Sequence, residues 1–215
     1  MPTKEQKREL DGLATIIEAI DGYRVGRNMD PRRFSEKLDE LDQLVRRAIG
    51  RVGRQRLEKV VDFVVNLPAR DPSAARWSAV FMVVRFLLRV AMVLFMLSLG
   101  LWVYGVTWAP HVTAVATALV YVVFVVRWYS LVKLEEFYER AMRDQPGKEK
   151  VLKRSANSLI RLLAAKIEEY GSKPSKHKLH LFKADYDGIR ILKRPSLLRE
   201  TYLAEVVSSE AVGGA

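Results

Sequence analysis

The residues nearest to a metal-binding pattern lie in the C-terminal part of the chain. His177 and His180 are three positions apart, and Asp185 and Asp187 follow shortly after. Imidazole and carboxylate groups are common metal ligands. The segment has the pattern of a β-strand, however, and residues three apart in a strand point to opposite faces. We therefore expect polar side chains at the base of a hairpin, and the sequence predicts no metal and no cofactor.

Carboxylates are the next candidates, because a pair of them can act as general acid and general base. Four acids, Glu36, Asp39, Glu40 and Asp42, fall in one amphipathic stretch among Lys and Arg residues, which is typical of a solvated helix face. The chain contains no glycine-rich phosphate loop, serine nucleophile elbow, His-Glu metalloprotease motif or Asp-rich calcium loop. Its lack of Cys excludes disulfide scaffolds and thiol catalysis. We expect a protein that is not an enzyme and has no small-molecule substrate.

Positive charge is the feature that most directly suggests a binding partner. The chain carries 36 Lys and Arg against 25 Asp and Glu, for a formal net charge of +11. One compact basic run, interrupted by a single acid, consists of Arg46, Arg47, Arg51, Arg54, Arg56 and Lys59. Near an anionic membrane surface, each such side chain contributes about 1 kcal/mol. Anionic lipid headgroups are the expected partner of this run, with an acidic protein or a nucleic acid as alternatives.

The elements that must position these charges include a long apolar segment. No acid occurs between Asp71 and Glu135, and no formally charged residue occurs from Val90 to Val126. A helix needs about 20 residues to cross a bilayer, so this segment predicts two spans, near 86–108 and 111–128. The break falls at Tyr104–His111, where Gly105 and Pro110 interrupt the run.

The flanks of the two spans predict the orientation of the hairpin. Arg residues flank both spans on the side of the chain termini, whereas the connecting loop offers only His111. Because flanking positive charge tends to remain in the cytoplasm, both termini are expected there, in a multi-pass protein of the cell membrane. The residues expected at headgroup level are Arg85, Arg89, Trp108, Arg127 and Trp128.

Small residues in the spans predict where the two helices approach each other. Ala91, Ser98 and Gly105 recur every seven residues in the first span, and the second span offers Ala114 and Ala118. Small side chains allow helix backbones to come close in lipid. This stripe is expected to close the hairpin on itself, and contact between copies in an oligomer is the alternative.

The N-terminal region, residues 1–76, is expected to form cytoplasmic helices. Leu10, Leu13, Ile17 and Ile20 follow helical spacing. Asp30 and Pro31 are a helix start signal. One stripe is expected to continue to a bend at Gly50 and Gly53, and a third short helix to end at Pro68. The members of that stripe are Phe34, Leu38, Leu41, Val45, Ala48 and Val52.

The remaining regions are the hairpin, residues 77–132, and a second cytoplasmic region, residues 133–207. The second span is expected to continue to about Ala141, with a stop at Pro146-Gly147 and another helix over 148–170. Asp187-Gly188 predicts a β-hairpin in which Tyr186 opposes Ile189, with a third strand at 202–207. Residues 208–215 are expected to form a flexible tail.

Together these patterns predict a mainly α membrane protein with a two-helix transmembrane hairpin, a cytoplasmic helical bundle and a small C-terminal β-hairpin element. The expected function is that of a non-enzymatic membrane-anchored scaffold or accessory subunit. Its basic helices would face a protein partner, or another copy of the chain, and the anionic bilayer surface. One alternative is an oligomeric, holin-like pore-forming protein. A second alternative is a membrane tether for nucleic acid.

Overall fold

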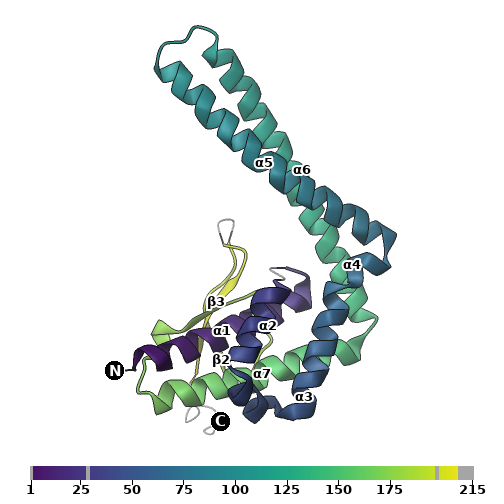
Figure 1. Cartoon of the computed structure of the whole chain (residues 1–215), viewed down its shortest axis with the longest axis vertical. Coiled ribbons are helices and arrows are strands. Elements are labelled where there is room, and N and C mark those ends of the chain that lie inside the picture. Colours follow the sequence, from purple (N-terminus) through teal and green to yellow (C-terminus); the bar gives the residue numbers. More distant parts are fainter. Residues whose placement is uncertain (1, 28–29, 197–198, 208–215) are drawn as a thin grey trace. The chain divides into compact units, whose positions relative to one another are not determined.

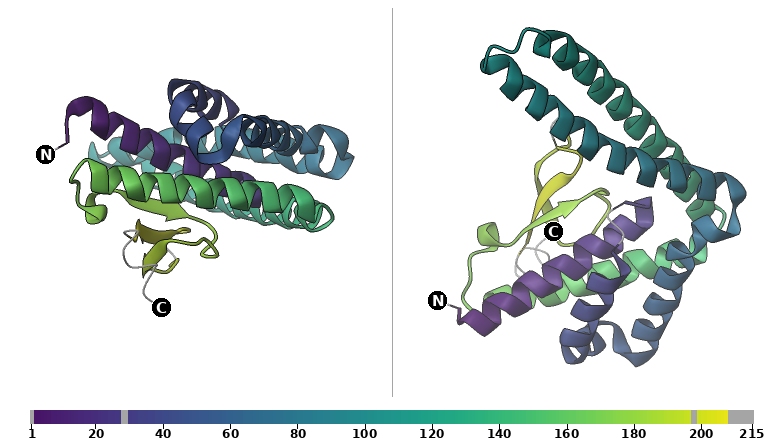
Figure 2. Two further views of the ribbon diagram at one scale, coloured as in Figure 1. Left: turned by 90° about the horizontal axis from the view of Figure 1, so that it is seen from below. Right: turned by 45° about the horizontal axis from the view of Figure 1, so that its top comes forward.

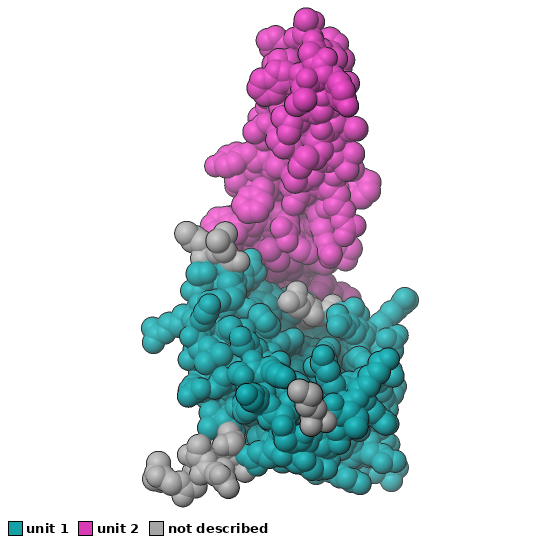
Figure 3. Space-filling view, turned by 90° about the vertical axis from the view of Figure 1, so that its left-hand side faces the viewer, with its two compact units in different colours: residues 1–66, 138–215 teal, residues 67–137 magenta. Residues whose placement is uncertain are grey.

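The protein is mainly helical and carries one small three-stranded sheet (Figure 1). The computed structural model describes residues 2–27, 30–196 and 199–207. The chain forms two compact units, shown in Figure 3. Unit 1 comprises residues 1–66 and 138–215, and unit 2 comprises residues 67–137. The two ends of the chain therefore share one unit, and the apolar hairpin is the other.

Unit 1 is built on four helices. They are α1 (Lys4–Val25), α2 (Pro31–Glu40), α3 (Asp42–Val65) and α7 (Pro146–Glu169). Helix α7 contacts both α1 and α3, and Figure 2 shows α1 and α7 side by side. Their facing stripes contribute core residues that are wholly buried, among them Leu10, Leu13, Ile17, Leu152 and Leu159. Burial of these stripes is the main stabilising contribution, at about 25 cal/mol per Å² of apolar surface.

Local signals account for where these helices begin. Thr3 accepts a hydrogen bond from the backbone N–H of Gln6, in a capping box that starts α1. Asp30 accepts one from the N–H of Arg33, and Pro31 occupies the first position of α2. The start predicted at Asp30-Pro31 is confirmed, as is a helix following the second span. The stop predicted at Pro146-Gly147 is a few residues late, because the preceding helix ends at Arg143 and Pro146 begins α7.

The apolar stripe predicted to run from Phe34 to Val52 is wrong at its last position. Phe34, Leu38 and Val45 are buried, whereas Val52 is 60% exposed. The predicted bend at Gly50 is confirmed, since this glycine has φ 73° and ψ 164° inside α3. A non-helical residue rotates the segment that follows it, so the periodicity before the bend does not carry over to Val52.

The sheet consists of three short strands in the order β1-β3-β2, with both pairings antiparallel. The strands are β1 (Lys178–Leu181), β2 (Ile189–Lys193) and β3 (Tyr202–Val206). The third strand predicted at 202–207 is confirmed, and it is the central one. The predicted pairing across Asp187-Gly188 is wrong, because Ile189 lies opposite Val206 rather than Tyr186. Residues 182–188 instead form a loop that is bonded to α1 and α7.

Unit 2 contains α4 (Leu67–Arg70), α5 (Pro72–Val103) and most of α6 (Ala109–Arg143). Asp71 caps α5 by accepting a hydrogen bond of 2.7 Å from the N–H of Ser73. Helix α5 therefore starts well before the predicted span, and it ends at Val103. The predicted break is confirmed, with Gly105 at φ 80° in the turn between α5 and α6.

A close approach between Gly26 and Tyr138 gives a test of packing in unit 1. Gly26 ends α1 at φ 73°, and a Cβ atom there would overlap the buried Tyr138 ring. Replacing Gly26 with Ala is expected to lower the free energy of unfolding by about 2–4 kcal/mol, from left-handed strain plus overpacking. Gly171→Ala, at φ 60° with no atom near the added Cβ, should cost only about 1 kcal/mol. Hydrogen exchange in α1 and α7 measures both losses, and equal losses would contradict the predicted overlap.

Candidate functional site

The surface of the α5–α6 hairpin is the most unusual feature of the molecule. Among the described residues, the exposed large apolar side chains lie between Met82 and Tyr129, apart from Val52 and Leu192. Only 11% of the most apolar stretch of α5 is buried, and 22% of that of α6. A core helix of a soluble protein would be mostly buried. Both helices are long and apolar enough to cross a membrane.

The hairpin buries small and polar side chains in its interior. Ala91 and Ser98 of α5 and Thr113 and Ala116 of α6 are buried. The two hydroxyls donate to carbonyl oxygens of their own helices, Ser98 to Phe95 and Thr113 to Ala109, both at 2.9 Å. Each polar group is therefore satisfied within its helix, as a low-dielectric environment requires.

The predicted small-residue stripe is only partly brought together. Gly105 lies in the turn and is exposed, and Ala114 and Ala118 are exposed on α6. On α6 the buried positions are instead Thr113 and Ala116. Spacing alone indicated small residues but not which face of α6 turns inward, because that depends on the turn between the helices.

The residues predicted at headgroup level flank the apolar stretches. Arg85 and Arg89 are exposed on α5, Trp108 lies exposed at the turn, and Trp128 is exposed on α6. Arg127 is half-buried. An aromatic contact that no sequence pattern predicted joins α5 and α6, where Trp77 and Tyr129 pack edge to face with ring centroids 5.5 Å apart.

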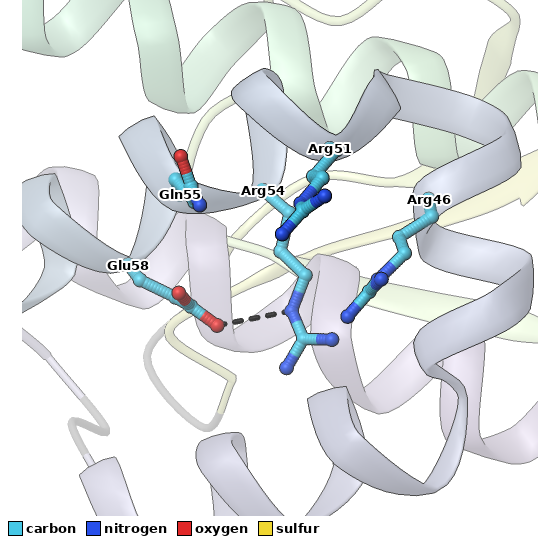
Figure 4. Close-up of a pocket in the computed structure, with 5 residues that line it drawn as sticks. All are labelled: Arg46, Arg51, Arg54, Gln55 and Glu58. Carbon is cyan, nitrogen blue, oxygen red and sulfur yellow. Dashed lines mark hydrogen bonds and ion pairs between the residues drawn. The ribbon is translucent and has the colours of Figure 1, made fainter.

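Three arginines of the basic run on α3 line a small hollow of about 190 Å³. Figure 4 shows its lining residues, which are Arg46, Arg51, Arg54, Gln55 and Glu58. The charges in it are largely balanced. Arg54 is only 12% exposed and pairs with Asp42, with Asp39 at 2.6 Å and with Glu58 at 3.0 Å. The Nε atom of Arg46 lies 2.8 Å from the Oδ1 atom of Asp42.

The bend in α3 divides the predicted basic run. Arg47, Arg56 and Lys59 are exposed but do not line the hollow. Asp39 and Asp42 lie at the junction of α2 and α3. The sequence pattern predicted that they belong to a solvated helix face, but both pair with Arg54. The charge left for an external anion is therefore smaller than the count of basic residues suggests.

Unit 1 contains a buried ionic network that no sequence pattern predicted. The Arg24 side chain is 2% exposed and donates two hydrogen bonds to Asp185, of 2.7 and 2.9 Å, and a third to Glu149 at 3.0 Å. The helical spacing of α1 indicates that Arg24 is buried, because position 24 continues the buried series of Leu13, Ile17 and Ile20. A charged residue on such a stripe requires a buried partner.

Asp21 completes this network from the same helix. Its carboxylate is fully buried and accepts hydrogen bonds from the N–H groups of Phe182 and Lys183 and from the hydroxyl of Tyr186, the last at 2.7 Å. Burial raises the pKa of Asp21, although these hydrogen bonds oppose the shift. The network joins α1, α7 and the 182–188 loop, and it explains why those residues do not pair as a hairpin.

The network predicts a dependence of stability on pH. The Arg24 guanidinium holds the pKa of Asp185 well below its usual range. A carboxyl with a lowered folded-state pKa stabilises the fold above its unfolded pKa, near 3.9, and loses that contribution as the pH falls further. Asp185→Asn should therefore destabilise unit 1 at pH 7, with a difference from the unmodified chain that shrinks below about pH 4. Urea unfolding followed by hydrogen exchange measures this, and a difference that is constant with pH would contradict it.

His177 lies in a second buried polar contact, between the end of α7 and α1. Its Nε2 is 2.9 Å from the hydroxyl of Ser172, and its Nδ1 is 3.8 Å from Asp11. The order resembles a serine–histidine–aspartate relay, but 3.8 Å is too long for a hydrogen bond. Burial lowers the pKa of His177, so the contact is best explained as a neutral packing contact.

The two predicted metal-candidate histidines differ in environment, since His177 is buried and His180 is exposed. In residues 2–27, 30–196 and 199–207, no group of three or more His, Asp or Glu side chains is placed to hold a metal ion. No protein-family model, curated protein or solved structure matches this chain. The fold and its surfaces thus define a mainly helical protein with two long apolar helices and a separate unit of helices and a small antiparallel sheet.

Proposed function

We propose that this chain is a membrane-anchored scaffold or accessory subunit. In this proposal α5 and α6 cross the bilayer, and unit 1 presents its surface to a protein partner on the cytoplasmic side. The observation that carries the proposal is the distribution of exposed apolar side chains. They cover the outside of the α5–α6 hairpin, whereas unit 1 buries its apolar residues in a core of its own.

The lengths of the helices fit a bilayer. From Phe86 to Val103, α5 extends about 27 Å at 1.5 Å per residue, and α6 extends equally far from Ala109 to Val126. The hydrocarbon core is about 30 Å thick. Arg89 lies within the first of these stretches, so its side chain would extend along the helix to the headgroups, as exposed Arg side chains do near helix ends.

Charge supports cytoplasmic termini for the proposed hairpin. Arg85 precedes the first apolar stretch, Arg89 lies in its first turn and Arg127 follows the second stretch, while His111 is the nearest basic residue to the turn. This asymmetry favours an orientation with the turn outside. Arg47, Arg56 and Lys59 of unit 1 are exposed, and in this proposal they are the charges of the basic run available to anionic headgroups.

The proposal is tested on the full chain expressed in a bacterial membrane. Resistance to extraction at alkaline pH is expected, and purified protein reconstituted in vesicles of neutral and anionic phospholipid is expected to retain a trapped dye. Release of the protein by alkali would overturn the membrane anchor. Dye release by an oligomer would contradict the scaffold function and favour the pore-forming alternative.

A further inference from the structure

The outer edge of β2 presents backbone groups to which no described element is hydrogen-bonded. The strand order β1-β3-β2 places both β1 and β2 at edges. The edge of β1 is closed by α1, because the N–H of His180 donates to Glu18 at 2.8 Å and that of Phe182 donates to Asp21. In the described part of the chain, no hydrogen bond joins the outer edge of β2 to another element.

The ladder between β2 and β3 identifies the backbone groups at this edge. The N–H of Val207 donates to the carbonyl oxygen of Gly188 at 2.9 Å, and Ile189 lies opposite Val206. In an antiparallel ladder this geometry directs the backbone of Arg190 toward β3. It leaves the N–H and C=O groups of Ile189 and Ile191 pointing away from the sheet, spaced as an added strand requires.

The side chains along this edge are basic and partly apolar. Arg190 is 68% exposed, and Lys193 and Arg194 are exposed beside it. Leu192 is 38% exposed and is one of the two exposed large apolar residues outside the hairpin among the described residues. The acid opposite is Glu205 of β3, which is paired with Arg190. The edge therefore offers backbone hydrogen bonds, an apolar contact and a net positive charge.

We propose that the outer edge of β2 binds an extended acidic segment of a partner protein as a fourth strand of the sheet. Its backbone pairs with Ile189 and Ile191, and its carboxylates lie near Arg190 and Lys193. A second copy of β2 fits poorly, because two basic edges would then lie side by side. The inference rests on the proposed scaffold function, since it names the surface and the chemical class of the partner.

The test uses the full chain in detergent micelles, labelled with 15N-isoleucine. The probe is a capped peptide of alternating Glu and Val, which can pair as a strand. A second acidic peptide of equal charge carries Pro at alternate positions and cannot pair. The first peptide is expected to slow hydrogen exchange at Ile189 and Ile191 and to leave the buried Ile17 and Ile160 amides unchanged. No protection, or equal binding of the proline peptide, would overturn the proposal.

Two substitutions locate the contact on β2. Ile191→Pro removes one outward N–H and is expected to weaken binding about fivefold, the effect of one lost hydrogen bond. Arg190→Ala is expected to weaken it at low salt, whereas Arg161→Ala, an equally exposed arginine on α7, should not. Equal effects of the two arginine substitutions on peptide binding would contradict binding at the edge of β2. Alkaline extraction of the same chain reports on the anchor separately, so either proposal can fail alone.

Discussion

Replacing Arg24 with Ala is expected to destabilise unit 1 by about 3 kcal/mol, since removing one partner of a buried ion pair typically costs 3–5 kcal/mol. The lower end applies because Asp185 and Glu149 are partly exposed and can be rehydrated, whereas Arg24 is 2% exposed. The substitution also leaves a void beside the Tyr186 ring, whose centroid lies 5.0 Å from the guanidinium. Both effects act on the junction of α1, α7 and the 182–188 loop.

The measurement must report on unit 1 alone. All four Trp residues, Trp77, Trp102, Trp108 and Trp128, belong to unit 2, so tryptophan fluorescence does not follow this unfolding. The unfolding of unit 1 is instead followed by hydrogen exchange of α1 and the 182–188 loop in increasing urea. Arg161→Ala is the control, because this exposed side chain lies 3.8 Å from Asp187 of the same loop, and its loss should change stability by less than about 0.5 kcal/mol. Equal effects of the two substitutions would show that the buried network adds no stability.

Placing two arginines on the outer face of α6 is expected to prevent its stable insertion into a membrane. Val115 and Val122 are 69% and 57% exposed and lie seven residues apart, on one helix face. Each Arg near the centre of a span costs about 2.5–3.5 kcal/mol. The variant carrying Val115→Arg and Val122→Arg should therefore become extractable at alkaline pH or be degraded.

The matched control changes the same number of exposed apolar residues outside the hairpin. Val52→Arg with Leu192→Arg adds the same charge to unit 1, where the two side chains are 60% and 38% exposed. This variant is expected to remain in the alkali-resistant fraction. If the α6 variant stays there too, or if both variants behave alike, the apolar surface of α6 does not contact lipid.

Local chemistry made several elements predictable. The start of α2 follows from a capping Asp30 and from Pro31, whose fixed φ suits the first helical position. The turn between α5 and α6 follows from Gly105, which adopts φ 80° there. The stop between α6 and α7 precedes Pro146. In each case the backbone preference of one or two residues decides the outcome, so neighbouring sequence is sufficient.

The charge patterns were harder to interpret, because pairing depends on where helices bend. The basic run on α3 was expected to face an external anion, yet Arg54 is held by carboxylates from three positions around the bend. The same limit applies to α6, where Thr113 and Ala116 rather than Ala114 and Ala118 are buried. A periodic pattern identifies a face but does not identify what that face will contact.

The sequence by itself determined most of the helices, the start of α2 and the presence of an apolar hairpin, since propensity and patterning act over a few residues. Only the tertiary structure decided the strand order and the buried ionic network. The Asp187-Gly188 turn signal favours a local hairpin, but Asp21 and Arg24 bind the residues that would form it. Those partners are more than 160 positions away in the chain. A buried carboxylate and guanidinium must be paired, and that requirement outweighs a local turn preference.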